Sequence, residues 1–191
     1  MSPAWAAMGR EWTFSSSVLP RAESSSRITF RFYDGEVRVH PLRELRSLCE
    51  RQFDSLVSEH GCRRRGRFIA GGFEVFYWNA ITGVRVLVQS RDPFTVDLCP
   101  MPAAKFPPRP GEYGARRRIE WYDAFDVVTL VSGRRPQFTP RELYGHDPVV
   151  IAAYADAVHG PCQSLLHGDP TLWARLRAQR EARVAEWRGR A

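Results

Sequence analysis

Three runs of alternating apolar and polar residues, separated by short turn sequences, constrain the fold of this chain more than any other feature. The runs cover 73–78, 84–89 and 94–98 of the 191 residues, with turn-like residues at 79–83 and 90–93. Strands joined by connections this short can pair with their neighbours only in the antiparallel sense. The sequence therefore predicts a three-stranded antiparallel meander over 72–98.

An amphipathic helix is expected directly before this meander. Between Pro41 and Gly61 apolar residues recur every three or four positions, and charged residues fill the other face. This period predicts a helix over 41–60. Pro41 fits the first helical position and Gly61 fits a C-terminal cap, which supports both ends of the assignment.

The N-terminal segment divides into two expected parts. Residues 1–26 are rich in serine and show no sustained period, which predicts a poorly ordered lead-in. After it, Asp34-Gly35 separates alternating runs at 28–33 and 36–40, the pattern of a two-residue β-hairpin. With 43% hydrophobic residues the chain can bury one good-sized core. We therefore expect a single domain over 27–191.

The C-terminal third is predicted to be helical. Thr139, Asp147 and Asp169 each precede a proline, which is the pattern of an N-cap followed by the first helical residue. The last helix is expected to reach about Arg188. Residues 119–131 fit either a helix or a strand, and their apolar spacing favours the helix. The predicted fold class is α+β, with the meander and the N-terminal hairpin packed against the preceding helix and the C-terminal helices.

The charge of the chain is strongly biased toward arginine. Arginine supplies all but one of the 28 basic residues, and the formal net charge is +7. A GC-rich genome explains such a bias without any function. Arginine is also the better residue for bidentate contacts to carboxylates and phosphates, and a basic protein attracts nucleic acid or an acidic partner. No apolar stretch approaches the ~18 residues of a membrane span, so no membrane partner is expected.

The cysteines do not form a recognisable framework. They are scattered and contain no Cys-x-x-Cys pair: Cys49, Cys62, Cys99 and Cys162. A chain of this length does not need disulfides to be stable, so we expect reduced, structural thiols and a cytoplasmic location. The sequence contains no nucleophile elbow, and no His or Cys pair has the spacing of a zinc site. No catalytic, cofactor or metal site is predicted.

One motif resembles a catalytic loop. His167-Gly168-Asp169 at the end of an apolar run is similar to the loop of aminoglycoside phosphotransferase-like kinases, in which the aspartate is the base. The matching magnesium-binding asparagine is Ala174 here, and the chain has no glycine-rich phosphate loop followed by lysine. Phosphoryl transfer needs metal ligands and phosphate neutralisation as well as a base. Gly168 is therefore interpreted as a helix end and Asp169 as the cap of the next helix.

Two arginine runs are the candidate contact residues. A helix followed by three strands and a helix is also the order of a double-stranded RNA-binding domain, but the lysine-rich start of that family's second helix is missing. What remains is the positive charge of the runs, together with two aromatics expected to be exposed. The candidate contacts with a partner or nucleic acid are Arg63, Arg64, Arg65, Arg67, Tyr77, Trp78, Arg116, Arg117 and Arg118.

Three stretches carry a further resemblance. Residues 53–61, 84–98 and Leu165-Leu-His-Gly-Asp169 resemble small bacterial proteins of unknown function, in which a helix ending near Gly-Phe precedes a meander and a Leu-Leu-x-Gly-Asp turn joins the last two helices. Cys62 stands where those proteins have the phenylalanine. They look like single-domain immunity or accessory proteins encoded near toxins or mobile elements. The resemblance implies a binding role and supplies no catalytic residue.

Two functions are therefore expected in order. The first is a non-enzymatic protein-binding module for a partner with an acidic surface, with an immunity-type or accessory protein of a toxin or mobile-element system as its narrower form. The alternative is a basic accessory nucleic-acid-binding protein that uses the two arginine runs.

Overall fold

The structure is a computed structural model that describes residues 39–101, 106–107 and 119–189. The expected lead-in over 1–26 and most of the expected hairpin lie outside these residues, as does the second arginine run at 116–118. Backbone contacts divide the chain into Met1–Phe30 and Arg31–Ala191. The description below concerns the second unit alone, and the single domain expected over 27–191 remains a prediction.

A five-stranded antiparallel sheet forms the centre of the described part. Its strands are β1 Arg63–Ile69, β2 Gly72–Trp78, β3 Thr82–Gln89, β4 Thr95–Pro100 and β5 Tyr122–Asp123. They lie in the sheet in the order of the sequence, so each strand pairs with the next one along the chain. β2, β3 and β4 confirm the predicted meander, which two further strands extend.

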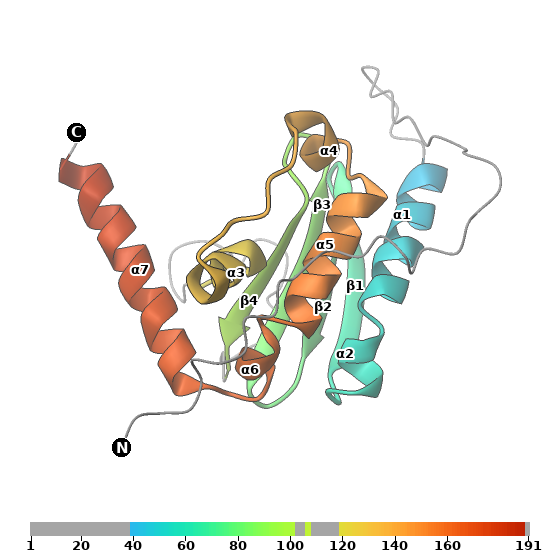
Figure 1. The fold of residues 1–191 in the computed structure, drawn as a ribbon. Coiled ribbons are helices and arrows are strands. Elements are labelled where there is room, and N and C mark those ends of the chain that lie inside the picture. The colour runs from blue at the N-terminus through green and yellow to red at the C-terminus, as the bar shows by residue number, and fades with distance from the viewer. Residues whose placement is uncertain (1–38, 102–105, 108–118, 190–191) are drawn as a thin grey trace. The chain divides into compact units, whose positions relative to one another are not determined.

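The described residues also form seven helices. They are α1 Val39–Gln52, α2 Ser55–Ser58, α3 Ala124–Ser132, α4 Pro140–Tyr144, α5 Pro148–His159, α6 Gln163–Leu166 and α7 Pro170–Gly189. α1 and α5 lie across one face of the sheet (Figure 1). The fold is therefore α+β, as predicted, with the preceding helix and the C-terminal helices packed on the sheet.

The main core lies between this face and the helices. Val75 and Tyr77 of β2 are fully buried there, and the Tyr77 ring lies 6.2 Å from the ring of Phe53, which follows α1. Ile151 of α5 and Val86 of β3 are also fully buried. Burial of each such side chain contributes roughly 1.5–3 kcal/mol, so this layer supplies much of the stability of the fold.

Strand β1 is absent from the sequence-based assignment. Its residues were assigned only as an arginine run, because arginine and glycine carry little strand propensity. In the structure β1 pairs with β2 through the two-residue turn Ala70-Gly71. Gly71 has φ +74°, the left-handed conformation that hairpin turns of this length require. Pairing with the apolar β2 decides the conformation of β1 against its local preference.

The start of the first helix also differs from the expectation. α1 begins at Val39, two residues before Pro41, so Val39 and His40 are helical and their assignment to a hairpin strand is wrong. Proline is tolerated in the first turn of a helix because the amides there have no intrahelical acceptor. Pro41 therefore marks the first turn of α1 without marking its first residue.

The predicted helix over 41–60 is divided in two. α1 ends at Gln52 and α2 covers only Ser55–Ser58, with tight turns between them. Gly61 follows with φ +61°, and the next amide, of Cys62, donates to the Leu56 carbonyl at 2.9 Å. Gly61 thus ends the helical segment as predicted, although a break near Phe53 precedes it.

Local signals at the other helix starts are confirmed. Thr139 and Glu142 form a capping box, and the side chains of Asp147 and Asp169 accept hydrogen bonds from the amides two residues later. The favoured helix over 119–131 is only partly correct. Tyr122-Asp123 is a strand, and α3 begins after it, with the Asp123 side chain as its cap.

Candidate binding surfaces

A row of five paired residues crosses the sheet on the face opposite α1 and α5. The strand register places Arg65, Phe76, Arg85, Asp97 and Asp123 directly beside one another, one from each strand. Residues that are paired in an antiparallel sheet project from the same face. The outward face of the meander is therefore a mixed charged and aromatic surface, whereas the opposite face is apolar.

Two ion pairs neutralise charge within this outward face. Arg85 Nη2 lies 2.7 Å from Asp97 Oδ2, and Arg67 pairs with Glu74 in the neighbouring row. Glu74 is only 2% exposed and Asp97 only 8% exposed. A buried carboxylate is tolerated only when it is paired and hydrogen-bonded. These four side chains are thus committed to the fold.

Aromatic rings cover the same two arginines. The Arg85 guanidinium lies 4.5 Å from the centre of the Trp121 ring, and that of Arg67 lies 5.3 Å from the centre of Phe76. The Phe106 ring contacts the rings of both Phe76 and Trp121, at 5.6 and 5.9 Å between centroids. The rings are engaged by cation–π and edge contacts.

The first arginine run is divided by the two-residue period of the strand. Arg63 and Arg65 are exposed and project from the outward face, where Arg63 is paired with half-buried Trp78. Arg64 projects from the helix-covered face, with Nη1 3.5 Å from Asp54 Oδ1, and Arg67 is held by Glu74. Only Arg63 and Arg65 form no ion pair with a described carboxylate.

One predicted contact residue is misplaced. Tyr77 was expected to be exposed, but it is completely buried beneath α1, and burial raises the pKa of its hydroxyl. Both faces of β2 are covered, so alternate residues of this strand do not reach solvent. Tyr77 is therefore removed from the candidates, and Trp78 stays. Arg116, Arg117 and Arg118 remain predictions outside the described residues.

An acidic corner adjoins the row at β5. The Tyr154 hydroxyl donates to Asp123 Oδ2 at 3.0 Å, and the Phe125 amide donates to Oδ1 at 2.7 Å. Burial raises the pKa of Asp123 to about 6 despite these bonds. Nearby, Asp126 pairs with Arg135 and Arg183. Sequence analysis missed this corner, because the assigned helix over 119–131 concealed that Asp123 caps α3.

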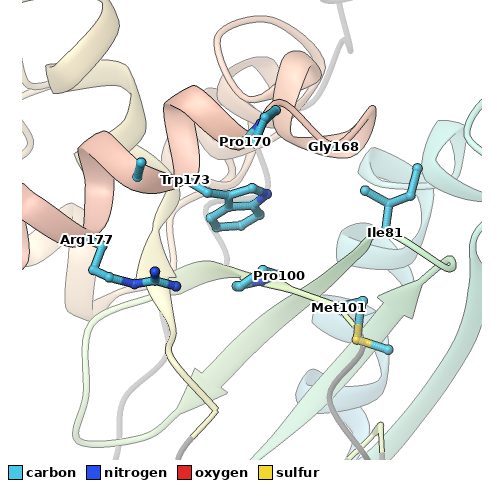
Figure 2. A pocket seen from close by; sticks show the side chains of 8 residues that line it. Ile81, Pro100, Met101, Gly168, Pro170, Trp173 and Arg177 are labelled. Atoms are coloured by element: carbon cyan, nitrogen blue, oxygen red, sulfur yellow. The ribbon is translucent and has the colours of Figure 1, made fainter.

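The chain has an apolar cavity at the start of α7. Its volume is about 250 Å³, and Figure 2 shows Trp173 and Arg177 of α7 on one side and Ile81, Pro100 and Met101 on the other. No nucleophilic or acidic side chain lines it among the described residues. The cavity can take an apolar side chain but contains no group for acid–base chemistry.

Three histidines gather where α2, α5 and α6 end. The rings of His60 and His167 lie 5.4 Å apart, and His159 Nε2 lies 2.8 Å from the Ser55 hydroxyl. Burial and the two neighbouring histidines lower the pKa of His60. The described residues nevertheless contain no group of three His, Cys, Asp or Glu side chains arranged to hold a metal ion.

The kinase-like motif is a structural turn. Gly168 has φ +85° after α6, and Asp169 Oδ1 accepts hydrogen bonds from the amides of Thr171 and Leu172, at 2.8 and 3.2 Å. The Asp169 carboxylate caps α7, as the sequence predicted. Its acceptor capacity is used by backbone amides at the start of this helix.

The cysteines are free and buried, as expected from their spacing. Burial raises the pKa of the Cys49 thiol to about 12 and that of Cys62 to about 11. Burial likewise raises the pKa of Cys99 to about 12, and it raises that of Cys162. A nucleophilic cysteine needs a lowered thiol pKa and access to solvent. These thiols have neither property.

Within the described ranges, no helix has the length and apolarity needed to cross a membrane. Comparison of the chain with protein-family models, with curated proteins and with solved structures found no match in any of the three.

Proposed function

We propose that this protein is a non-enzymatic binding module whose partner is another protein with an acidic surface. The observation that supports it most directly is the pair Arg63 and Arg65. Both are exposed on one face of the outermost strand, beside Trp78, and no described carboxylate neutralises them. The other charged side chains of that face are paired within the fold.

Arginine and tryptophan at one margin of a surface suit protein recognition. These residue types are enriched among the side chains that dominate interface energies. An arginine that binds no carboxylate of its own chain keeps its bidentate donors for a partner's Asp or Glu. The net charge of +7 adds a long-range attraction for such a partner.

The groups that would suggest an enzyme have structural explanations. The thiols are buried with raised pKa values, Asp123 caps α3, and Asp169 caps α7. The cavity beside Trp173 is apolar. A catalytic pair would need a base and a nucleophile within reach of each other in an accessible site, and the features above do not supply this combination.

The narrower form of the proposal is an immunity-type or accessory protein of a bacterial toxin or mobile-element system. It rests on the resemblance described for 53–61, 84–98 and the Leu165–Asp169 turn. We also propose a cytoplasmic location, which the four free thiols support, since a reducing compartment keeps such thiols unpaired.

Affinity capture from the host tests the proposal. The tagged protein is expected to retain a stable partner of acidic composition, and the double variant Arg63→Glu/Arg65→Glu is expected to lose it. Arg91→Glu, at an exposed arginine in the β3–β4 turn, is the matched control and should retain the partner. Recovery of no stable partner by the wild-type protein would contradict the proposed function.

The alternative function is nucleic-acid binding through 63–67 and 116–118. It predicts a complex whose affinity falls steeply as salt rises. The division of the first run between two faces disfavours it, because Arg64 and Arg67 contact carboxylates and buried Tyr77 cannot stack on bases. Absence of any shifted duplex or single-stranded probe in a low-salt gel would exclude this alternative.

A further inference from the structure

β1 is an open edge of the sheet. It is the outermost strand, seven residues long, and within the described ranges no strand pairs with its outer side (Figure 1). The closing pair of its two-residue turn, Ile69 and Gly72, faces inward with its hydrogen-bonding groups. Alternation then directs the backbone amides of Arg64, Gly66 and Phe68 outward. Such an edge is a ready template for another strand.

The charges on β1 restrict which strand can pair there. Four of its seven residues are arginine and none is acidic. Like charges placed directly opposite one another across strands are destabilising, so pairing with β1 of a second copy is disfavoured. An acidic strand meets the opposite situation, because each carboxylate placed opposite Arg63 or Arg65 gains a charge-assisted hydrogen bond.

We propose that the open edge of β1 binds an extended acidic segment of the partner protein, which adds to the described sheet as a sixth strand. This inference rests on the proposed protein-binding function and specifies its mode. In strand addition, backbone hydrogen bonds supply affinity and alternate side chains supply specificity. The length of β1 limits the paired segment to about seven residues.

The two ends of β1 differ in what they offer. Arg63 and Arg65 present positive charge at one end, whereas the other end presents the half-exposed Phe68 ring beneath the Arg46 guanidinium, 5.2 Å from the ring centre. Between them Gly66 has no side chain, and a Cβ there would lie 2.5 Å from Arg46 Nη2. The matching segment has acidic residues at one end and an apolar residue at the other.

A short peptide tests the mode without knowledge of the partner. The probe is a fluorescein-labelled seven-residue peptide of alternating glutamate and valine, with both ends blocked. Its control is the same peptide with every backbone nitrogen methylated, which keeps all charges but removes every donor. Fluorescence anisotropy at low salt is expected to show binding of the probe and at least tenfold weaker binding of the control.

Protein variants separate charge from strand pairing. Arg63→Glu/Arg65→Glu is expected to weaken probe binding at least tenfold, and Arg91→Glu less than twofold. Hydrogen exchange should slow on probe addition at the amides of Arg64, Gly66 and Phe68, which face the open edge. Equal affinity for the two peptides, no binding of the probe, or no protection at these amides overturns the proposal.

The outcomes also separate this inference from the proposed function. If a captured partner binds equally well to the wild-type protein and to Arg63→Glu/Arg65→Glu, the edge mode is wrong and the binding function stands. If no partner is captured but the probe pairs with β1, the edge mode stands as chemistry while the proposed function fails. Tighter binding of a single-stranded oligonucleotide than of the probe would overturn the proposal in favour of nucleic acid.

Discussion

Asp97 and Asp123 lie directly opposite each other across β4 and β5, so two carboxylates share one face of the sheet. Burial raises the pKa of both, in opposition to the Arg85 contact at Asp97 and the Tyr154 contact at Asp123. Each carboxylate also raises the pKa of its neighbours in this corner, since like charges disfavour ionisation. The fold therefore carries an electrostatic cost here at neutral pH.

Asp123→Asn is expected to stabilise the protein at pH 7. The pKa of Asp123 is about 6 in the fold against a model value of 3.8, so between about pH 4 and 6 the native state binds more protons than the unfolded state. Stability conferred by this group therefore falls as pH rises through that window. The amide keeps an acceptor for Phe125 and Tyr154, and we expect a gain on the order of 2 kcal/mol.

The measurement is urea unfolding of both proteins from pH 4 to 7, with exposed Asp156→Asn as the control. The gain should grow with pH and then level off above the native pKa. A difference between Asp123→Asn and wild type that is constant across the series would contradict the assigned cause.

Asp97→Ala is expected to destabilise the fold by about 3 kcal/mol, since it leaves the Arg85 guanidinium without its carboxylate in a largely buried site. Side-chain exposure there is 16% for Arg85 and 12% for Asp97. Arg135→Ala removes a contact to Asp126 from an arginine that is 54% exposed and should cost less than about 1 kcal/mol. Chemical denaturation of the two variants checks this order, and a reversed order would refute it.

Gly72→Ala should disrupt the sheet between β2 and β3. A Cβ at Gly72 would lie 1.9 Å from the backbone oxygen of Val88, which cannot move without separating the strands. We expect a loss of at least ~2 kcal/mol, at the upper end of overpacking effects. Gly189→Ala, with no atom within 4 Å of the added Cβ, is the neutral control. Thermal unfolding followed by circular dichroism distinguishes them.

The four thiols should be unreactive in the native protein. All are buried, and burial raises the pKa of Cys49 and Cys99 to about 12. Because the thiolate is the reactive form, a thiol reagent at pH 8 is expected to modify none rapidly in buffer and all four in denaturant. Rapid native modification of one cysteine would identify an accessible thiol and weaken the non-enzymatic proposal.

His60 should titrate below an ordinary histidine. Burial lowers its pKa first, followed by the charges of His167 and His159, whereas Glu59 opposes the shift. The unfolded chain therefore binds the proton more tightly, and the stability conferred by His60 is lost as pH falls below about 6.5. Titration of the imidazole signals by NMR should show the His60 midpoint rising in His167→Gln. An unchanged midpoint would exclude coupling between the two rings.

Features encoded within a few residues were predictable from the sequence. The alternation over 72–98 identified β2, β3 and β4, because short connections permit only antiparallel neighbours. The caps at Thr139, Asp147 and Asp169 were equally clear, since each side chain bonds amides two or three residues away.

Features that depend on distant residues were not. β1 exists because β2 pairs with it, although its arginines disfavour a strand, and Tyr77 is buried because α1 covers its face of the sheet. In the candidate surface, the sequence identified the arginine run but not which members remain unpaired. That selection depends on the strand period and on Asp54 and Glu74, whose positions opposite Arg64 and Arg67 only the tertiary structure decides.

The sequence by itself thus determined the α+β class, the meander and the helix caps of this protein, because turn chemistry and periodicity act locally. Only the tertiary structure decided that the arginine run is an edge strand with Arg63 and Arg65 exposed. Strand pairing and ion pairing join residues far apart in the chain, and their free energy outweighs the weak local preference of each segment.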